Sequence, residues 1–150
     1  METHTPPAPL SILVVEDNPV DVYIMNWVLK SHDFAYDLQV MNNGNYAMDY
    51  ISQFAHEERP RSPTIVLLDL HLPQVDGKEV LRQIKALPQG ADIPVVIVTS
   101  STNPTDRRET LALGADAYFV KPSDLHEFLW LGEVIKHLVF GDPPSFTQHI

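Results

Sequence analysis

The sequence contains no cysteine among its 150 residues. This absence excludes disulfide bonds, thiolate metal sites and cysteine nucleophiles, and it agrees with a cytoplasmic protein. The sequence has no run of eighteen consecutive apolar residues, so it predicts no membrane-spanning helix. The amino terminus, METHTPPAP, lacks the basic start and the apolar stretch of a secretory signal, and its prolines indicate a disordered arm over residues 1–9.

Basic residues are also few. Ten Lys and Arg stand against 20 Asp and Glu, which gives a formal net charge of −10. Because nucleic-acid binding depends on cationic side chains that neutralise phosphates, the absence of a basic stripe predicts no nucleic-acid partner. The sequence also lacks the G-x-x-x-x-G-K-[ST] pattern of P-loop nucleotide enzymes.

Five apolar segments alternate with helical patterns in a chain that is 44% apolar, which is enough for one core. The predicted strands are Leu10–Val15, Tyr36–Met41, Thr64–Asp69, Pro94–Thr99 and Asp116–Val120. The predicted helices lie near residues 19–32, 44–56, 77–87, 104–113 and 123–139. Three strands are rich in Val and Ile without polar alternation, so we expect an α/β fold whose parallel sheet is covered on both faces.

No linker divides the sequence, and we therefore expect a single domain over residues 10–140. The last ten residues, GDPPSFTQHI, are predicted to form a tail over residues 141–150, because their prolines do not allow a helix to continue.

Charged and polar side chains follow the predicted strands at their carboxyl ends, where open parallel sheets bind ligands. Glu16 and Asp17 follow the first strand, Asp69 ends the third, Thr99 ends the fourth, and Lys121 follows the fifth. Taken singly, the acids have ordinary structural interpretations as helix-dipole partners or loop caps. Together they would repel one another without a cation, and a set of oxygen ligands without His or Cys suits Mg²⁺.

This combination predicts phosphoryl transfer, in which catalysis is mostly positioning and charge stabilisation. Asp69 would act as the nucleophile and form an aspartyl-phosphate. The Lys121 ammonium would pair with Asp69 or with a phosphoryl oxygen, and the Thr99 hydroxyl could donate to the same oxygen.

Four segments, ILVVEDNPVD, VLLDLHLPQVDG, IPVVIVTS and GADAYFVKP, resemble the signature segments of the response-regulator receiver domain. They occur in order and at the family's spacing, and the resemblance covers residues 10 to 139. It implies a doubly wound, flavodoxin-like (βα)₅ fold whose five parallel strands lie in the order 2-1-3-4-5.

The resemblance also implies roles for individual residues. Glu16, Asp17, Asp69 and the backbone carbonyl of His71 would hold Mg²⁺. Asp69 would take a phosphoryl group from the phosphohistidine of a sensor histidine kinase. The protein would then be a phosphoacceptor in two-component signalling rather than an enzyme with a separate substrate.

Thr99, Tyr118 and Pro122 match the switch positions of the family, and Lys121 lies beside them. Thr99 and Lys121 would contact the bound phosphoryl group. Tyr118 occupies the aromatic switch position, and it could swing into space that Thr99 vacates. Lys121–Pro122 matches a peptide bond that is usually cis in this family, and a cis bond here would direct the ammonium toward the site.

The sequence stops after the fifth predicted helix, so we expect output through protein contacts or phosphorelay. The chain is similar to stand-alone receivers that serve phytochrome-type sensor kinases. On a helical wheel, one stripe of the last helix faces the sheet and comprises Leu125, Phe128, Leu129, Ile135 and Val139. A second apolar stripe on the opposite side comprises Trp130, Val134 and Leu138. This second stripe predicts a homodimer through the helix, unless the tail covers it.

Three alternative functions make different demands on the sequence. A haloacid-dehalogenase-type phosphatase needs a second acid two residues after its nucleophile, where this chain has His71. A flavodoxin-like cofactor binder needs a first loop that attracts phosphate, whereas VEDNPVD carries acids. A pseudo-receiver scaffold that is never phosphorylated stays open, although every active-site identity of the family is present.

Overall fold

A computed structural model describes residues 8–53, 63–88 and 90–141. Its five strands form one parallel sheet in the order β2-β1-β3-β4-β5, which confirms the predicted topology. The strands are β1 (Leu10–Val15), β2 (Tyr36–Met41), β3 (Ile65–Leu68), β4 (Val95–Thr99) and β5 (Ala117–Val120). The predicted amino-terminal arm and the carboxyl-terminal tail lie almost entirely outside the described residues.

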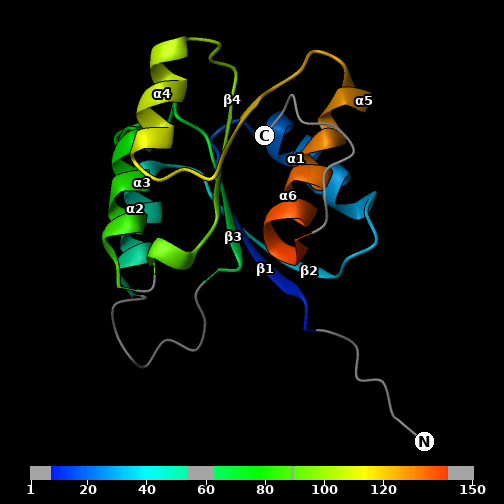
Figure 1. The fold of residues 1–150 in the computed structure, drawn as a ribbon, viewed down its shortest axis with the longest axis horizontal. Helices are drawn as coiled ribbons and strands as arrows, with labels where there is room; N and C mark the ends of the chain where they lie inside the picture. The colour runs from blue at the N-terminus through cyan, green and yellow to red at the C-terminus, as the bar shows by residue number, and fades with distance from the viewer. Residues whose placement is uncertain (1–7, 54–62, 89, 142–150) are drawn as a thin grey trace, which may run out of the picture.

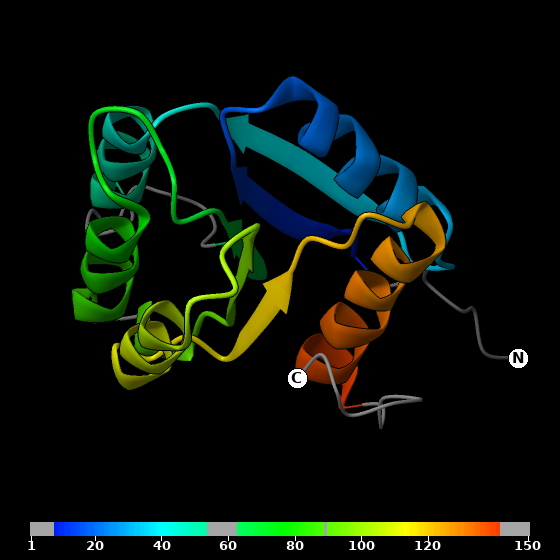
Figure 2. The same cartoon turned by 90° about the horizontal axis from the view of Figure 1, so that it is seen from above.

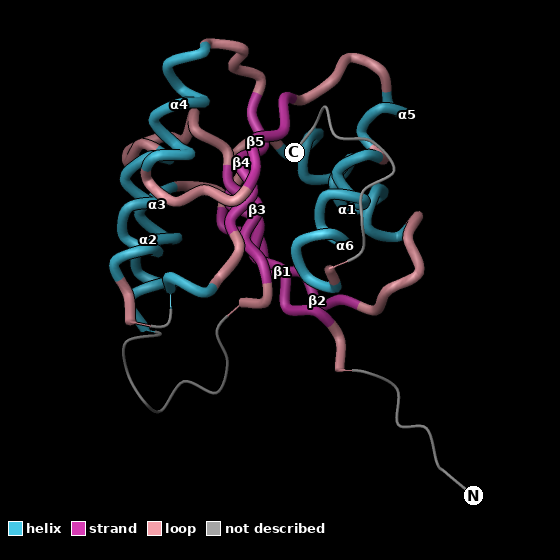
Figure 3. The backbone as a smooth tube through the Cα atoms, viewed as in Figure 1, coloured by secondary structure: helices cyan, strands magenta, loops and turns pink. Residues whose placement is uncertain are grey.

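Helices cover both faces of the sheet (Figure 1). The helices are α1 (Pro19–Lys30), α2 (Gly44–Ser52), α3 (Gly77–Ala86), α4 (Pro104–Ala112), α5 (Leu125–Phe128) and α6 (Trp130–Phe140), with a 3₁₀ turn, η2, at Gly90–Asp92. Figure 3 shows α2, α3 and α4 on one side of the strands and α1, α5 and α6 on the other, and Figure 2 shows the same separation from above.

The sheet divides the apolar interior into two clusters. Successive side chains of a strand point to opposite faces, so Ile12 and Val14 of β1 pack against α1 and α6, whereas Leu13 and Val15 pack toward α2 and α3. All four side chains are almost completely buried. This burial on both faces explains why the central strands lack polar alternation.

Short polar caps begin the helices close to the ends of the strands. Asn18 accepts a hydrogen bond from the backbone N of Val20 at 2.9 Å, and Pro19 occupies the first turn of α1. Asp76 caps α3 in the same way through the backbone N of Lys78. The loop after β1 spans only residues 16–18, and the longer loop after β3 spans residues 69–76, so Glu16 and Asp69 directly follow their strands.

The predicted last helix, residues 123–139, differs from the structure. It is divided at Leu129 into α5 and α6. The predicted faces are right only in part: Phe128 and Ile135 of the first stripe are buried, but Leu125 is 53% exposed, and Val134 of the second stripe is completely buried. Trp130 and Leu138 are partly buried against the same cluster. The reason is that α6 packs against both the sheet and α1, which covers a wider arc than one stripe.

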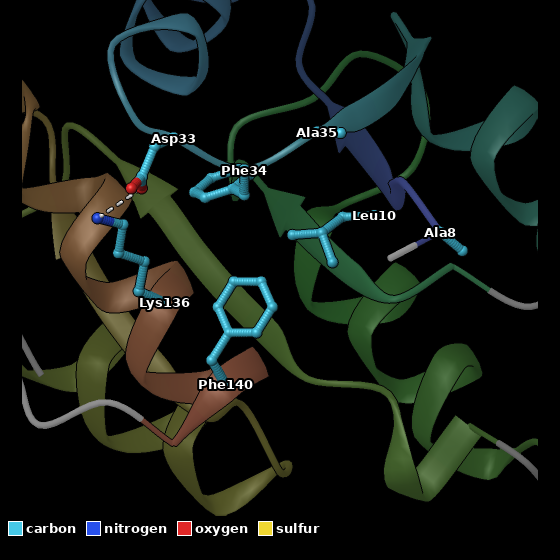
Figure 4. Close-up of a pocket in the computed structure, with 7 residues that line it drawn as sticks. All are labelled: Ala8, Leu10, Asp33, Phe34, Ala35, Lys136 and Phe140. Carbon is cyan, nitrogen blue, oxygen red and sulfur yellow. Dashed lines mark ion pairs between the residues drawn. The ribbon is translucent and has the colours of Figure 1, made fainter. Parts of the chain in front are cut away.

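A cavity of about 330 Å³ lies at the amino ends of the strands (Figure 4). Leu10, Phe34 and Phe140 line it, and the ion pair between Asp33 and Lys136, 3.4 Å from N to O, lies at one side. Because Leu10 begins β1, this cavity is at the opposite end of the sheet from the acidic residues that follow β1. None of the described helices has the length and apolar character needed to cross a membrane.

Candidate phosphoacceptor site

Three carboxylates converge at the carboxyl edge of the sheet. The register pairs Val15 of β1 with Leu68 of β3, so the residues that follow, Glu16, Asp17 and Asp69, emerge side by side. One oxygen from each lies within 4.8 Å of the others. Glu16 and Asp69 are buried, at 1% and 6% exposure, and Asp17 is open to solvent. The structure therefore places the predicted acids together.

Lys121 joins this group from β5. Its Nζ donates to Oε1 of Glu16, to Oδ2 of Asp69 at 3.1 Å, and to Oδ2 of Asp21 at 2.7 Å. Its side chain is only 9% exposed. One largely buried ammonium thus contacts three carboxylates, which reduces their mutual repulsion.

These contacts change the acidity of the groups. Burial raises the pKa of Glu16, and the neighbouring Asp69 raises it further, to about 8. Burial would also raise the pKa of Asp69, but hydrogen bonding with Glu16 and the charge of Lys121 hold it below its usual value. Burial would lower the pKa of Lys121, whereas hydrogen bonds to Asp21 and Glu16 raise it above its ordinary value. The site therefore favours an ionised Asp69 beside a protonated lysine.

The expectation of a cis bond between Lys121 and Pro122 is wrong, because the described backbone contains no cis peptide bond. The backbone N of Lys121 instead donates to the carbonyl O of Thr99 at 2.7 Å. This contact continues the pairing of β4 and β5 for one residue beyond Val120 and so brings Lys121 to the acidic edge.

Thr99 at the end of β4 and Tyr118 in β5 both contact Ser101, which lies in the loop that follows β4. Thr99 is completely buried, and its Oγ1 accepts a hydrogen bond from the backbone N of Ser101 at 3.3 Å. The Tyr118 hydroxyl donates to the carbonyl O of Ser101 at 2.9 Å, and the Arg107 guanidinium lies 5.5 Å from the ring centre. Tyr118 is 2% exposed, so its ring is already inside the protein in this conformation.

Sequence reasoning missed a polar network that joins this loop to two helices. The Ser101 hydroxyl donates to Oδ2 of Asp106 at 2.6 Å, and Lys78 Nζ lies 2.8 Å from Oδ1 of Asp106 and 2.6 Å from Oε2 of Glu109. Hydrogen bonds from Lys78 and Ser101 lower the pKa of Asp106. No local pattern signals a pair 28 positions apart.

Asp21 was also missed. It lies three residues after the capping Asn18, a spacing that resembles a capping box and so favours a purely local role. The structure directs its carboxylate to Lys121 instead. For His71, the backbone N donates to Oδ1 of Asp69 at 3.3 Å, and a metal-binding role of its carbonyl stays a prediction.

Residues 12–130 match the response regulator receiver domain. The chain belongs to this family. Response regulator Rcp1 of Synechocystis sp. is 36% identical over 119 residues, which are 79% of this chain and 81% of that protein. The resemblance drawn from the four sequence segments is thereby confirmed.

Solved receiver structures share the fold, and two of them contain a divalent cation. Phosphorylated RcpA, a cyanobacterial phytochrome response regulator, has a TM-score of 0.79 and 28% identity, and the match covers 93% of this chain and 100% of RcpA. Mn²⁺-bound Rcp1 has a TM-score of 0.75 and 33% identity, with 95% and 99% covered. The receiver domain of the Pseudomonas aeruginosa sensor kinase PA1611, with Mg²⁺ in its active-site cleft, has a TM-score of 0.71 and 26% identity, with 89% and 99% covered. These neighbours and the acidic cluster support the predicted magnesium cofactor.

Proposed function

We propose that this receiver accepts a phosphoryl group on Asp69 from the phosphohistidine of a sensor histidine kinase. The observation that carries the proposal is the contact of the buried Lys121 ammonium with Asp69 inside a group of three carboxylates. A purely structural ion pair would need one acid for one lysine. Here the excess of acids leaves negative charge for a cation to neutralise.

The residues fit Mg²⁺. Glu16, Asp17 and Asp69 supply hard oxygen ligands without a competing His or Cys in the same group, and Asp17 opens the group to solvent. The His71 carbonyl would complete the protein ligands. When bound, the ion would neutralise the acids and the charge that develops on a transferring phosphoryl group.

The protein's own residues would then direct the transfer. An oxygen of Asp69 forms a bond to phosphorus, the bond from phosphorus to the donor nitrogen breaks, and the imidazole leaves with the electron pair. Lys121 would hold one phosphoryl oxygen and the Thr99 hydroxyl another. Movement of Thr99 would pull the backbone N of Ser101, whose carbonyl holds Tyr118. The conformational effect of the phosphoryl group would thus reach the loop after β4 and α4.

The partner would be a sensor kinase, with the phytochrome type favoured by relatives that are named phytochrome response regulators. Tyr23 and Trp27 of α1 are 76% and 37% exposed, and Leu125 beside them is 53% exposed. This apolar surface lies next to Asp21 and the site, where a kinase would have to dock. A sensor kinase that is phosphorylated by ATP would place the reaction in the cytoplasm.

Output would occur through protein contacts or phosphorelay, and the chain would act as a signalling protein rather than as an enzyme with a separate substrate. We also propose a homodimer through the last helix, although the apolar stripe expected to form the contact is smaller than predicted, because its members are buried or partly buried. With Val134 buried, the contact would centre on Phe140, which is 51% exposed. Sedimentation of a pure monomer at high concentration, with and without phosphorylation, would contradict it.

The function is tested by incubating the protein with Mg²⁺ and acetyl phosphate and measuring intact mass. We expect a mass increase of one phosphoryl group that requires the metal and disappears in Asp69→Ala. Asp49→Asn, a change on the exposed side of α2, is the matched control and should be phosphorylated normally. No phosphorylation by acetyl phosphate or by any kinase would instead favour the pseudo-receiver scaffold.

A further inference from the structure

Lys121 contacts Asp21 in addition to Glu16 and Asp69. Neither metal binding nor the acceptor chemistry gives Asp21 a role. It lies in the first turn of α1, and its side chain is 19% exposed. Its Oδ2 lies 2.7 Å from Lys121 Nζ, a shorter separation than the 3.1 Å to Asp69. Among the described residues, the acidic group that fits a metal comprises Glu16, Asp17 and Asp69 and does not include Asp21.

The geometry of the ammonium gives this contact a consequence. A lysine ammonium has three N–H donors, and here they face three carboxylates, those of Glu16, Asp21 and Asp69. A cation bound by Glu16 and Asp69 would draw on the same two carboxylates, so it would compete with two of the lysine's three contacts. The contact with Asp21 can persist, because Asp21 approaches from α1, outside the metal group.

We propose that Asp21 is a positioning residue for phosphoryl transfer. It holds the Lys121 ammonium beside Asp69 while the other two donors pass from carboxylate oxygens to phosphoryl oxygens. Without it, the flexible four-carbon stem of lysine would have to be ordered during the transfer itself. This inference rests on the proposed function, since it concerns the same reaction at Asp69.

Two other roles for Asp21 make different predictions. If its charge only favours the helix dipole of α1, its loss lowers stability and leaves the transfer rate unchanged. If its charge mainly repels anionic donors, its loss increases the rate. The positioning role requires the rate to fall.

The test uses acetyl phosphate at saturating Mg²⁺ with the full-length protein. In the reaction, an Asp69 oxygen bonds to phosphorus as the bond from phosphorus to the acetate oxygen breaks, and acetate leaves with the electron pair. We expect Asp21→Asn to lower the maximal rate by about tenfold, the effect of one charge-assisted hydrogen bond. The half-saturating concentration of acetyl phosphate should change by less than about twofold. Asp21→Glu, which keeps the charge, should restore most of the rate, and Asp49→Asn should match the wild type.

A double-mutant cycle separates positioning from loss of structure. If Asp21 acts through Lys121, Asp21→Asn has no further effect on the rate in a Lys121→Met background. An unchanged or faster Asp21→Asn protein, or an equal effect of Asp21→Asn in both backgrounds, would overturn the inference while leaving the proposed function intact. Failure of the wild-type protein to form a phosphoryl adduct that depends on Asp69 would instead reject the proposed function.

Discussion

The Lys78 ammonium lies 2.8 Å from Oδ1 of Asp106 and thereby joins the first turn of α3 to the first turn of α4. This ion pair matters because α4 has little apolar anchorage: Thr110 is its one completely buried residue, and Leu111 is 42% exposed. A helix with few buried apolar contacts opens at low free-energy cost, so polar contacts set its position.

Lys78→Met should therefore loosen α4. We expect faster hydrogen exchange of the α4 amides, together with a loss of global stability below about 1 kcal/mol, because the pair is partly exposed. Arg82→Met is the matched control, since it removes an ion pair with Glu79 inside α3 and leaves α4 untouched. Equal α4 exchange rates in the wild-type and Lys78→Met proteins would show that the ion pair does not hold this helix.

The same ion pair predicts an acid dependence. Hydrogen bonds from Lys78 and Ser101 lower the pKa of Asp106 from its ordinary 3.8. Since the folded state binds this proton more weakly than the unfolded chain, the stabilisation is present above pH 3.8 and is lost as pH falls through the lower folded pKa. The stability difference between wild type and Lys78→Met, measured by urea unfolding, should shrink in that range. A difference that does not change with acid would contradict the assignment.

The raised pKa of Glu16 predicts a pH dependence of stability with the opposite sign. Its pKa is raised from 4.5 to about 8, mainly by burial, so the folded protein holds this proton more tightly than the unfolded chain does. Stability in the absence of Mg²⁺ should therefore decrease as pH rises from 4.5 to about 8. Mg²⁺ should offset the decrease and bind more tightly at the upper end, because the metal needs the ionised carboxylate. Thermal unfolding with and without Mg²⁺ measures both effects, and in Glu16→Gln the pH dependence should be weaker.

Tyr118→Phe tests the hydrogen bond between the Tyr118 hydroxyl and the Ser101 carbonyl. Removing this buried donor leaves the carbonyl unpaired, so we expect a loss of about 1 kcal/mol in unfolding free energy. Tyr23→Phe, which changes a residue that is 76% exposed, should have no effect. Equal stabilities of Tyr118→Phe and wild type would mean that water replaces the hydroxyl.

Gly77→Ala should displace the backbone of Asp69 and Leu70 and so disturb the site. A Cβ at this position would lie 2.3 Å from the carbonyl O of Asp69 and 2.7 Å from the Leu70 Cα, and neither backbone atom can move cheaply. We expect both lower stability and slower phosphorylation by acetyl phosphate. Gly141→Ala is the contrasting variant, because its positive φ costs about 1 kcal/mol but nothing lies within 4 Å of the added Cβ. It should leave phosphorylation unchanged, whereas normal phosphorylation of Gly77→Ala would show that the loop adapts.

The sequence could predict the meeting of Glu16, Asp69 and Lys121 because each directly follows a strand, and parallel strands end at one edge. Asp21 and Lys78 could not be predicted in the same way. They lie on helices, and their partners depend on how each helix is rotated and on which rotamers fill the space between elements. The faces of the last helix were predicted only in part for a related reason, since a wheel drawn through Leu129 assumes one continuous helix.

The division of the interior by the sheet has an evolutionary consequence. Tyr118 and α3 share one apolar cluster, whereas α1 and α6 share the other. Substitutions on the surface of α1 therefore need not repack the side chains around Tyr118. Sequence change on one side of the sheet can thus accumulate without a matching change in the cluster on the other side.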